Sequence, residues 1–553
     1  MRYRSETRRS AARLKVVTAL TLLAGVLTPA GAMVYKPASG ARIWDPSVIY
    51  HDGMYYAFSM YGTSGKAMTN VGLAISENGV HWKDHGPVIT DDITVFKPFV
   101  AKVGDTFFLN HGSFTGHGKQ RKQNRLCYFS SENLVDWTFL YADQPDPQYY
   151  DPERRWDHMY VLPKDENDPS AGYWGYVVAK PAAGKGLFGG MQESDDGLHW
   201  RQLPPPEVDW KSFPPPEAEW KGFDLPLLEL GGVERIDGRF YMLGGRPDPS
   251  RGFENYGVYT LVADDPRGPF RPDWEAFRLC GTTGYEESGV TSLAAFARGR
   301  DGEILVSNYL RAGAVVWMLP LRKAVVDGEG HLRLGYWPGN EAAKGERLPL
   351  ASEDFVHWGG VKPTDVPSGI LKVSTGLPKK RAKFENEIAL ALGGEELDLE
   401  RGVIAEARLR VGVLPWKRRI PAAGFLIEEA SGTGKAALLE VGHPWRRRTM
   451  VGDLDFRDLL ESGSSASFNP IDVVRQGEAT VRGIGRDEEV TLRLWIRQGM
   501  FEFYVDDRLA RVGIYDPAAA TGRIGFVVQN AELTVRALRV WQMNFESENL
   551  YPE

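Results

Sequence analysis

A seven-residue motif that recurs along the N-terminal half of the chain constrains the fold more than any other feature. It begins with serine, ends with tryptophan and encloses a polar turn, and its first three copies begin 55 and 63 residues apart. Asn-Gly and Asp-Gly pairs favour tight turns between strands, and a fixed indole can cap the resulting sheet. The spacing suits a four-stranded propeller blade, whereas a β-sandwich of many hairpins does not explain a repeat that spans four strands. The copies are SENGVHW (76–82), SENLVDW (131–137), SDDGLHW (194–200) and a distant SEDFVHW (352–358), which is predicted to be only a linker turn.

A second recurring element is an alternating strand, a glycine turn and an aromatic or aliphatic return strand. VIYHDGMYYAF, FVAKVGDTFFL and VERIDGRFYML are examples. Strands of this kind bounded by turn residues predict β-hairpins. We therefore expect an all-β protein whose residues 33–345 form a five-bladed β-propeller. The blades are predicted to start near Asp45, Lys97, Asp157, Glu229 and Ser288.

The sequence pattern changes after about residue 375, where alternating strands continue without the Ser-to-Trp motif. In LRLWIRQGMFEFYVDDRLARV, turns are predicted at Gln498-Gly499 and Asp506-Asp507. Residues 376–543 are therefore predicted to form a β-sandwich, joined to the propeller by a linker over 346–375. Residues 544–553 are expected to be a disordered tail.

The N-terminus resembles a targeting segment. Residues 1–32 combine a basic start, an apolar stretch over Val16–Leu27 that is too short to span a bilayer comfortably, and an A-x-A cleavage site at Ala30-Gly31-Ala32. They predict a signal peptide and a secreted or periplasmic protein, with no membrane segment in the mature form; the alternative is a cytosolic protein that starts at Met33.

The net charge of the whole chain is −7, which gives no reason to expect a nucleic-acid partner.

The remaining signals exclude several site chemistries. Two cysteines, Cys127 and Cys280, imply no disulfide framework, and whether they pair is left open. The sequence contains no metal-ligand spacing, phosphate-cradling glycine loop or nucleophile elbow, so no metal or cofactor is expected.

Two carboxylates precede strand–turn–strand units of the same design. Asp45 lies eight residues before the turn glycine Gly53, and Glu229 lies nine residues before Gly238. The proline after Asp45 is expected to hold that aspartate in an extended conformation, and the leucines around Glu229 are expected to raise its pKa. Radial repetition would bring both acids to one central funnel, and paired carboxylates are the usual equipment for cleaving a glycosidic bond. The alternatives are a turn-initiating Asp-Pro and a solvent-facing strand end.

A third acid, Asp157, opens the third predicted blade beside a cation and an aromatic ring, with Asp151 as its competitor. Such a carboxylate can hydrogen-bond a sugar hydroxyl and change the pKa of neighbouring acids. Glu287, with Glu286, is the rival of Glu229 at the start of blade five. Ring stacking and hydrogen bonding to the sugar are predicted for Trp44, His111, Arg155, Trp156, His158, Arg246 and Glu287.

Taken together, these phrases resemble the five-bladed propeller glycoside hydrolases of families 32 and 43. Asp45 in WDPSVIYHDGMYY stands where those families keep their first catalytic aspartate, Asp157 in RWDH resembles the middle aspartate, and Glu229 falls at the spacing of the general acid. RQGMFEFYVDDRLARVGIY is similar to the β-sandwich that follows the propeller in family 32. The resemblance implies that Asp45 is nucleophile or general base, Glu229 general acid and Asp157 the residue that stabilises the transition state, and it favours retention of configuration.

The chain also departs from these families. Trp44 and Ser47 stand where the invertase group usually has asparagines, and Arg155-Trp156-Asp157-His158 replaces its Arg-Asp-Pro. The sequence therefore predicts a glycosidase of the fructofuranosidase or arabinofuranosidase type that acts on an oligo- or polysaccharide. The alternatives are a glycoside phosphorylase on the same propeller, which would need a cationic phosphate pocket, and a non-catalytic propeller that only binds glycans.

Overall fold

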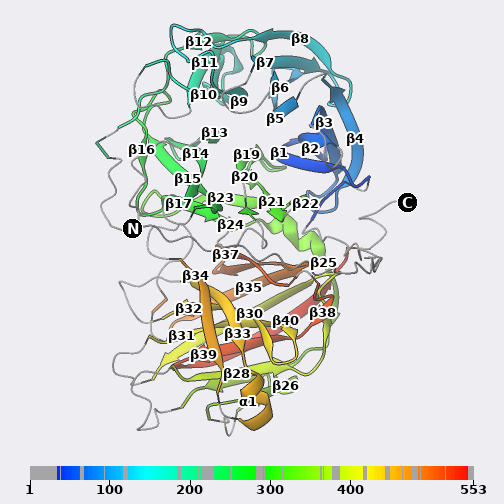
Figure 1. Ribbon diagram of the computed structural model, residues 1–553, viewed down its shortest axis with the longest axis vertical. Coiled ribbons are helices and arrows are strands. Elements are labelled where there is room, and N and C mark those ends of the chain that lie inside the picture. Colours follow the sequence, from blue (N-terminus) through cyan, green and yellow to red (C-terminus); the bar gives the residue numbers. More distant parts are fainter. Residues whose placement is uncertain are drawn as a thin grey trace, which may run out of the picture.

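The chain folds into two all-β parts, which lie one above the other in Figure 1. The computed structural model describes residues 34–545 apart from short segments, of which 213–228, 377–385, 475–483 and 282–289 are the longest. The predicted signal peptide, the glutamates at 286 and 287 and residues 546–553 lie outside the described residues. None of the described helices is long and apolar enough to cross a membrane.

Blades 1 to 4 each contain four successive antiparallel strands. Blade 1 consists of β1 (Arg42–His51), β2 (Met54–Gly62), β3 (Asn70–Ser76) and β4 (Lys83–Thr90). Blade 2 consists of β5 (Thr94–Val103), β6 (Thr106–Thr115), β7 (Lys122–Ser131) and β8 (Thr138–Asp143). Blade 3 consists of β9 (Trp156–Pro163), β10 (Tyr173–Ala179), β11 (Gly190–Ser194) and β12 (Arg201–Leu203), with a 3-10 turn over Pro169–Ala171. Blade 4 consists of β13 (Glu229–Ile236), β14 (Arg239–Asp248), β15 (Gly252–Ala263) and β16 (Arg271–Pro272), and β17 (Arg278–Gly281) also pairs with β15.

The predicted fifth blade is divided between two sheets, so four blades are complete separate sheets. β18 (Val290–Thr291) pairs with β21 (Tyr309–Ala312) and β22 (Val315–Met318). β19 (Ala295–Arg298) instead leads through β20 (Ile304–Ser307) and β23 (Arg322–Val326) to β24 (Leu332–Tyr336). Strands β1, β5, β9, β13 and β19 nevertheless contact one another in a closed ring, so five innermost strands surround the propeller axis.

The recurring Ser-to-Trp motif is the turn between the third and fourth strands of blades 1, 2 and 3. In each copy the serine hydroxyl accepts a backbone N–H three residues later, as Ser76 does from Gly79 at 2.9 Å, and the closing indole donates to a carbonyl in the turn. Such Asx- and Ser-type bonds replace the strand ladder where the chain reverses. The turn needs a left-handed residue, which is Gly79, Gly197 or, without glycine, Leu134.

The fourth copy of the motif lies outside the propeller. Ser352–Asp354 forms a 3-10 turn that leads into β26 (Phe355–Trp358), a strand of the second domain. β25 (Lys344–Leu348) and β27 (Ile370–Ser374) also pair with a strand of that domain, β40 (Ala531–Met543). The predicted linker over 346–375 is therefore wrong, because its alternating apolar residues complete the sandwich sheets.

The sandwich consists of two sheets that enclose an apolar core. The first sheet adds β30 (Val403–Val413), β35 (Glu489–Arg497), β36 (Met500–Val505) and β37 (Arg508–Ile514) to the strands around β40. The second adds β28 (Ile388–Gly393), β39 (Ile524–Gln529), β31 (Ala422–Ala430), β32 (Thr433–Glu440), β33 (Thr449–Asp455) and β34 (Ser467–Val474) to β26. A small ladder pairs β29 (Leu397–Asp398) with β38 (Thr521–Gly522), and α1 (Arg457–Ser462) covers the outer face of the second sheet.

Two-residue turns close the sandwich hairpins where they are predicted. Gln498, Gly499, Asp506 and Asp507 all have positive φ, between 47° and 87°. Positive φ at both central residues is the type I′ geometry that matches the twist of paired strands. Phe425 packs edge-on against Phe501 and Phe503 beneath these hairpins, at ring-centroid distances of 5.5 and 5.3 Å.

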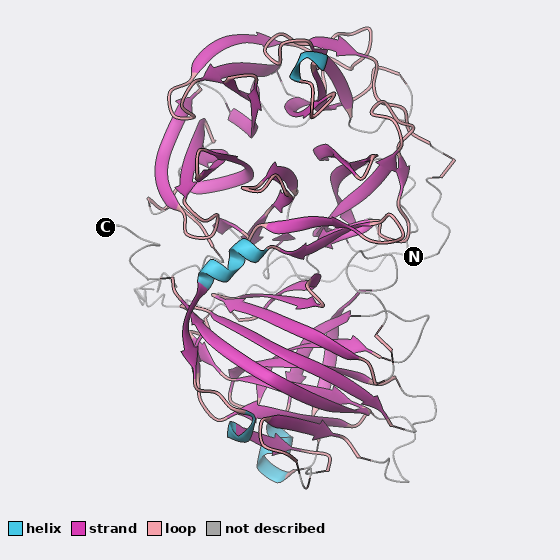
Figure 2. Ribbon diagram, turned by 180° about the vertical axis from the view of Figure 1, so that it is seen from behind, coloured by secondary structure: helices cyan, strands magenta, loops and turns pink. Residues whose placement is uncertain are grey.

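The propeller and the sandwich are joined by continuous structure. Gly335 of β24 pairs with Arg508 of β37, so one sheet runs from the fifth blade into the sandwich. The 3-10 helix Pro338–Ala343 follows at the junction, where Figure 2 shows it from behind. Residues 544 and 545 return to the propeller: Asn544 contacts His81 at 2.9 Å and Phe545 packs on the same imidazole. The predicted disordered tail is thus wrong for its first two residues.

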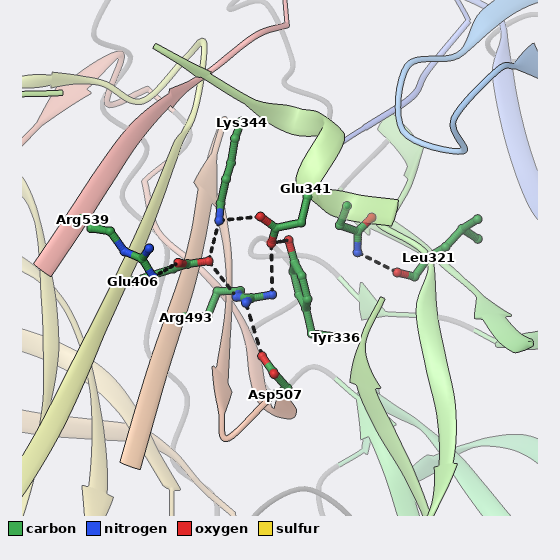
Figure 3. A network of polar contacts seen from close by, with 9 residues as sticks. Leu321, Tyr336, Glu341, Lys344, Glu406, Arg493, Asp507 and Arg539 are labelled. Carbon is green, nitrogen blue, oxygen red and sulfur yellow. Dashed lines mark hydrogen bonds and ion pairs between the residues drawn. The ribbon is translucent and has the colours of Figure 1, made fainter. Parts of the chain in front are cut away.

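A polar network surrounds this junction (Figure 3). Arg493 lies 3.1 Å from Glu406 and 3.3 Å from Glu341, and its guanidinium stacks on Tyr336. Lys344 contacts the same two glutamates at 2.6 Å each. Since these groups come from both domains and their linking helix, the network fixes the angle at which the domains meet.

A second, fully buried ion pair crosses the junction. Arg322 of β23 contacts Glu502 of β36, and both side chains are 0% exposed. Arg322 also donates to Asn308 at 2.7 Å, and the Tyr504 hydroxyl donates to Glu502 at 2.5 Å. These hydrogen bonds satisfy charges that would otherwise be costly to bury.

We predict that Arg322→Met destabilises the protein strongly, because it leaves the Glu502 charge buried without its partner. The free energy of unfolding should fall by about 3–5 kcal/mol. The double variant Arg322→Met/Glu502→Leu should recover a large part of that loss in urea titrations, and Arg457→Met in the exposed helix α1 should change little. Equal stability of the single and double variants would contradict this account.

Candidate active site

Asp45 enters the site through a bulge in β1. The pairing of β1 with β2 shifts register between Trp44 and Ser47, and Asp45 between them has φ of 51°. The expectation that Pro46 holds Asp45 in an extended conformation is therefore wrong. A bulge inserts an extra residue and re-aims its side chain, and left-handed conformations of residues other than glycine concentrate at functional sites. The bulge thus directs the carboxylate towards the neighbouring first strands.

Lys97 stands in a similar bulge in blade 2. β5 shifts register between Phe96 and Phe99, and Lys97 has φ of 26°. Phe96-Lys97-Pro98 copies the pattern of Trp44-Asp45-Pro46, an aromatic residue, a charged residue and a proline. Lys97 is 3% exposed, and its ammonium donates to the Leu230 carbonyl at 3.3 Å. A buried cation therefore stands at the position in blade 2 that the aspartate holds in blade 1.

The Leu230 carbonyl is an acceptor shared by two blades. β13 shifts register between Leu230 and Gly232, which releases this carbonyl from the regular ladder. Besides Lys97, the Nε2 of His158 lies 2.6 Å from it and donates to it. Burial, followed by the charges of Lys97 and Arg155, holds the pKa of His158 well below its usual value, so the imidazole is neutral. These donors fix the residue next to Glu229.

Glu229 binds a cation with one oxygen and a phenol with the other. Arg155 Nη1 lies 3.3 Å from Oε1, and the Tyr256 hydroxyl donates to Oε2. The cross-strand partner of Glu229 is Gly245, where an added Cβ would overlap the Tyr256 hydroxyl. The prediction that Glu229 has apolar surroundings is thus incomplete, because both carboxylate oxygens have polar donors.

Arg155 also binds Asp157, so one guanidinium joins two carboxylates. Its Nε and Nη2 both lie 2.5 Å from Asp157 Oδ2. Asp157 is fully buried, whereas the Glu229 and Arg155 side chains are 32% and 22% exposed. The cluster is therefore anchored on Asp157 and accessible from solvent at Glu229.

Burial and neighbouring charges shift the pKa values of Asp45 and Lys97. Burial raises the pKa of Asp45 to about 7, and the Glu229 charge adds to this rise, while Lys97 opposes it together with a hydrogen bond from Tyr309. Burial lowers the pKa of Lys97 to about 8 against the attraction of Asp45 and Glu229. Carboxylates with strongly shifted pKa values in an accessible cluster are typical of catalytic sites.

The structure thus brings Asp45, Asp157 and Glu229 together with Arg155 and His158. Trp44 is half-buried beside them, with its ring edge-on to Tyr309 at 5.7 Å. Arg246 is 7% exposed and follows Gly245, the cross-strand partner of Glu229.

Two predicted sugar contacts lie elsewhere. Trp156 is fully buried, and its indole donates to Asp143 at 2.9 Å, so it has no ring face open to a sugar. His111 points to the opposite side of β6, where it stacks on Phe129. Glu287 lies outside the described residues.

Three members of the cluster were not predicted from the sequence. The sequence predicts Lys97 only as the start of a blade, although the repeated charged residue before proline is a usable signal. Tyr256 and Tyr309 gave no such signal, because their hydroxyls reach the carboxylates from strands β15 and β21, which do not belong to the recurring phrases.

Comparisons with solved structures match the whole two-domain fold. The chain is similar to a sucrose-6-phosphate hydrolase from Lactobacillus gasseri, with a TM-score of 0.61 and 13% identity over 94% of this chain and 93% of that one. It is also similar to a β-fructofuranosidase from Aspergillus kawachii, with a TM-score of 0.60 and 12% identity over 94% and 95%. A family 32 glycoside hydrolase from Bifidobacterium adolescentis gives a TM-score of 0.58 and 12% identity over 93% and 81%. The predicted fold, a propeller followed by a sandwich, is confirmed.

Sequence comparison gives a shorter match. The chain is 32% identical over 79 residues to an arabinan endo-1,5-α-L-arabinosidase A from Aspergillus niger. This match covers 13% of the chain and a quarter (25%) of the length of that relative. No protein-family profile matches the chain.

We predict that Lys97→Met raises the pKa of Asp45 above its value of about 7, because the variant removes the cation that most favours the carboxylate. The carboxyl carbon of Asp45, followed by NMR on protein with isotope-labelled aspartate, should then titrate at higher pH. Lys102→Met, which removes an exposed lysine from the same strand, is the matched control. An unchanged Asp45 titration in Lys97→Met would contradict the assigned interaction.

Proposed function

We propose that the protein is a glycoside hydrolase that cleaves furanose-type oligo- or polysaccharides. The observation that carries the proposal is the cluster itself, in which Asp45, Asp157 and Glu229 from three blades interact through Lys97 and Arg155. Glycosidic cleavage needs one carboxyl to protonate the leaving oxygen and a second to act at the anomeric carbon. The fold that the chain shares with fructofuranosidases supports this chemistry.

In the proposed mechanism, Asp45 attacks the anomeric carbon while Glu229 transfers its proton to the leaving oxygen. The glycosyl ester on Asp45 is then hydrolysed by a water molecule that loses its proton to the Glu229 carboxylate. Because Asp157 is fully buried, it would act on the sugar through Arg155, which binds both Asp157 and Glu229 and would hold them at a fixed separation. The configuration of the first product, followed by NMR, distinguishes this retaining path from an inverting one in which Asp45 activates water.

Lys97 distinguishes this site from a simple pair of acids. A buried ammonium beside Asp45 favours the charged form of that carboxylate. It therefore keeps a fraction of Asp45 ionised at neutral pH although burial favours the acid. The Lys97 ammonium would also stabilise the negative charge that develops on the leaving oxygen if the glycosidic bond breaks before the proton has been transferred.

The phosphorylase alternative is less well supported. Phosphate would need an accessible cation, and Arg155 already binds two carboxylates.

We also propose that the protein is exported. The basic start, apolar stretch and A-x-A sequence of residues 1–32 support this, because they are the parts of a signal peptide.

We predict that Glu229→Gln lowers kcat on natural oligosaccharides by about 10²–10⁴-fold, the usual contribution of a general acid. Activated aryl furanosides should be affected much less, because their leaving groups depart without protonation. Glu275→Gln, at an exposed glutamate of the same blade, is the control. Normal cleavage of oligosaccharides by Glu229→Gln would refute the acid assignment, and sugar binding without release of product from any substrate would favour a glycan-binding propeller.

The pH profile separates the two carboxylates. If Asp45 acts as its ionised form, kcat/KM should rise with pH through an apparent pKa near 7. If Asp45 is instead the acid, kcat/KM should fall through the same value. The groups that set this limb are those that face Asp45, namely Lys97, Glu229, Tyr309 and Arg155. In the Lys97→Met variant the rising limb should move to higher pH by about one pH unit.

A further inference from the structure

Three potential metal ligands meet between blades 1 and 2, apart from the carboxylate cluster. Asp91 follows the last strand of blade 1, His111 lies on β6 and Cys127 on β7. A carboxylate oxygen, a ring nitrogen and the sulfur of these residues all lie within 4.8 Å of one another. His111 and Cys127 are buried, and the Asp91 side chain is 13% exposed.

Strand register brings these groups together. His111 and Cys127 are direct cross-strand partners, as are Ser113 and Arg125 two residues further along. Side chains at alternate positions share one face of a sheet, so all four project to the side facing blade 1. Asp91 closes this face, since its backbone N–H donates to Thr69 of blade 1 at 2.8 Å and its carboxylate accepts the Ser113 hydroxyl at 3.0 Å.

The tautomer of His111 suits metal binding. Its Nδ1 lies 3.1 Å from the Gly112 carbonyl oxygen, which can only accept, so Nδ1 carries the proton. The lone pair is therefore on Nε2, which is buried and has no hydrogen-bond partner within the described part of the chain. A backbone carbonyl that fixes one ring nitrogen so that the other can bind a metal is the usual second contact of a ligating histidine.

We propose that Asp91, His111 and Cys127 form a binding site for a zinc-like divalent cation. Thiolate, imidazole and carboxylate together match the preferences of Zn²⁺, and three protein ligands leave its fourth position to water. Tetrahedral bonds of about 2.0–2.3 Å would set the ligand atoms roughly 3.3–3.8 Å apart, so the cluster needs to contract by only about 1 Å. Ser113 and Arg125 orient the Asp91 carboxylate through its two oxygens.

Binding replaces one proton. Burial raises the pKa of the Cys127 thiol to about 11, so the free thiol is protonated at neutral pH. The cation takes the sulfur lone pair as the S–H bond breaks, and the proton goes to solvent. No oxidant or other reactant is required.

The site lies back to back with the candidate active site. Gly112, which follows His111, faces blade 3, where an added Cβ would come within 2.8 Å of the Asp157 Cα. A metal bound to His111 would therefore stiffen the strand that supports Asp157 without touching the carboxylates. The proposal does not rest on the proposed hydrolase activity.

The test uses the mature protein after treatment with a chelator. Addition of Co²⁺ should give a thiolate-to-cobalt charge-transfer band, and Zn²⁺ should bleach it and raise Tm as expected for a ligand of the native state. After equilibration with Zn²⁺ and gel filtration, metal analysis should find about one zinc per chain.

The second cysteine supplies a matched control. Cys280 is also buried but lies in blade 4, so Cys280→Ser should retain the band, the bound zinc and the Tm increase. Cys127→Ser should lose all three. Ser113→Ala, which removes a hydroxyl that hydrogen-bonds both Asp91 and the Cys127 sulfur, should weaken zinc binding by about 10–100-fold. No zinc on the unmodified protein, or an equal band in Cys127→Ser, would overturn the proposal and leave an ion pair of Asp91 with Arg125 beside a core histidine.

Discussion

The closed ring of first strands is the constraint on which the candidate site depends. Because β1, β5, β9, β13 and β19 contact one another around the axis, side chains at their starts come close together, and Lys97 and Asp157 among them are buried. Charges placed there must be compensated by one another, since an isolated buried charge is very unfavourable. Asp45, Asp157 and Glu229 are balanced in part by Lys97 and Arg155, and the Leu230 carbonyl takes up hydrogen bonds from Lys97 and His158. The register shifts in β1, β5 and β13 make this possible, because each frees a short backbone segment from the ladder.

The fold could be predicted from the sequence where one signal was local and repeated. The Ser-to-Trp turns have their hydrogen bonds within seven residues, so the motif itself specifies the geometry, and the type I′ turns at Gln498-Gly499 and Asp506-Asp507 are local in the same way. The linker and the divided fifth blade could not be predicted so well. β25 and β27 become strands because β40, far later in the chain, supplies the partner, and β24 continues into β37 through a single pair. Such pairings depend on tertiary contacts that no local pattern encodes.

The candidate site, too, could be predicted only where its residues belong to a local, repeated pattern. Asp45 and Glu229 were predicted because each belongs to a recurring phrase, and the structure places both in one cluster. Their surroundings were not predictable: the left-handed backbone of Asp45 results from a bulge that depends on β2, and the hydroxyl that binds Glu229 comes from Tyr256 through the space left by Gly245. Trp156 shows the reverse error. An aromatic ring beside a candidate aspartate suggests sugar stacking, but alternation along β9 sends the indole into the core, where Asp143 accepts its N–H.

The departures from the family 32 and 43 phrases fit this arrangement. Ser47, at a position where the invertase group usually has asparagine, is fully buried and its hydroxyl accepts the Val100 N–H at 3.4 Å, so it ties blade 1 to blade 2 close to Asp45 and Lys97. Trp156, inserted between Arg155 and Asp157, anchors the start of β9 in the core and still allows Arg155 to reach back to that aspartate. Both residues thus lie close to a carboxylate of the cluster and contribute to its surroundings. The differences from the family phrases therefore lie in the residues next to Asp45 and Asp157 and not in the two carboxylates.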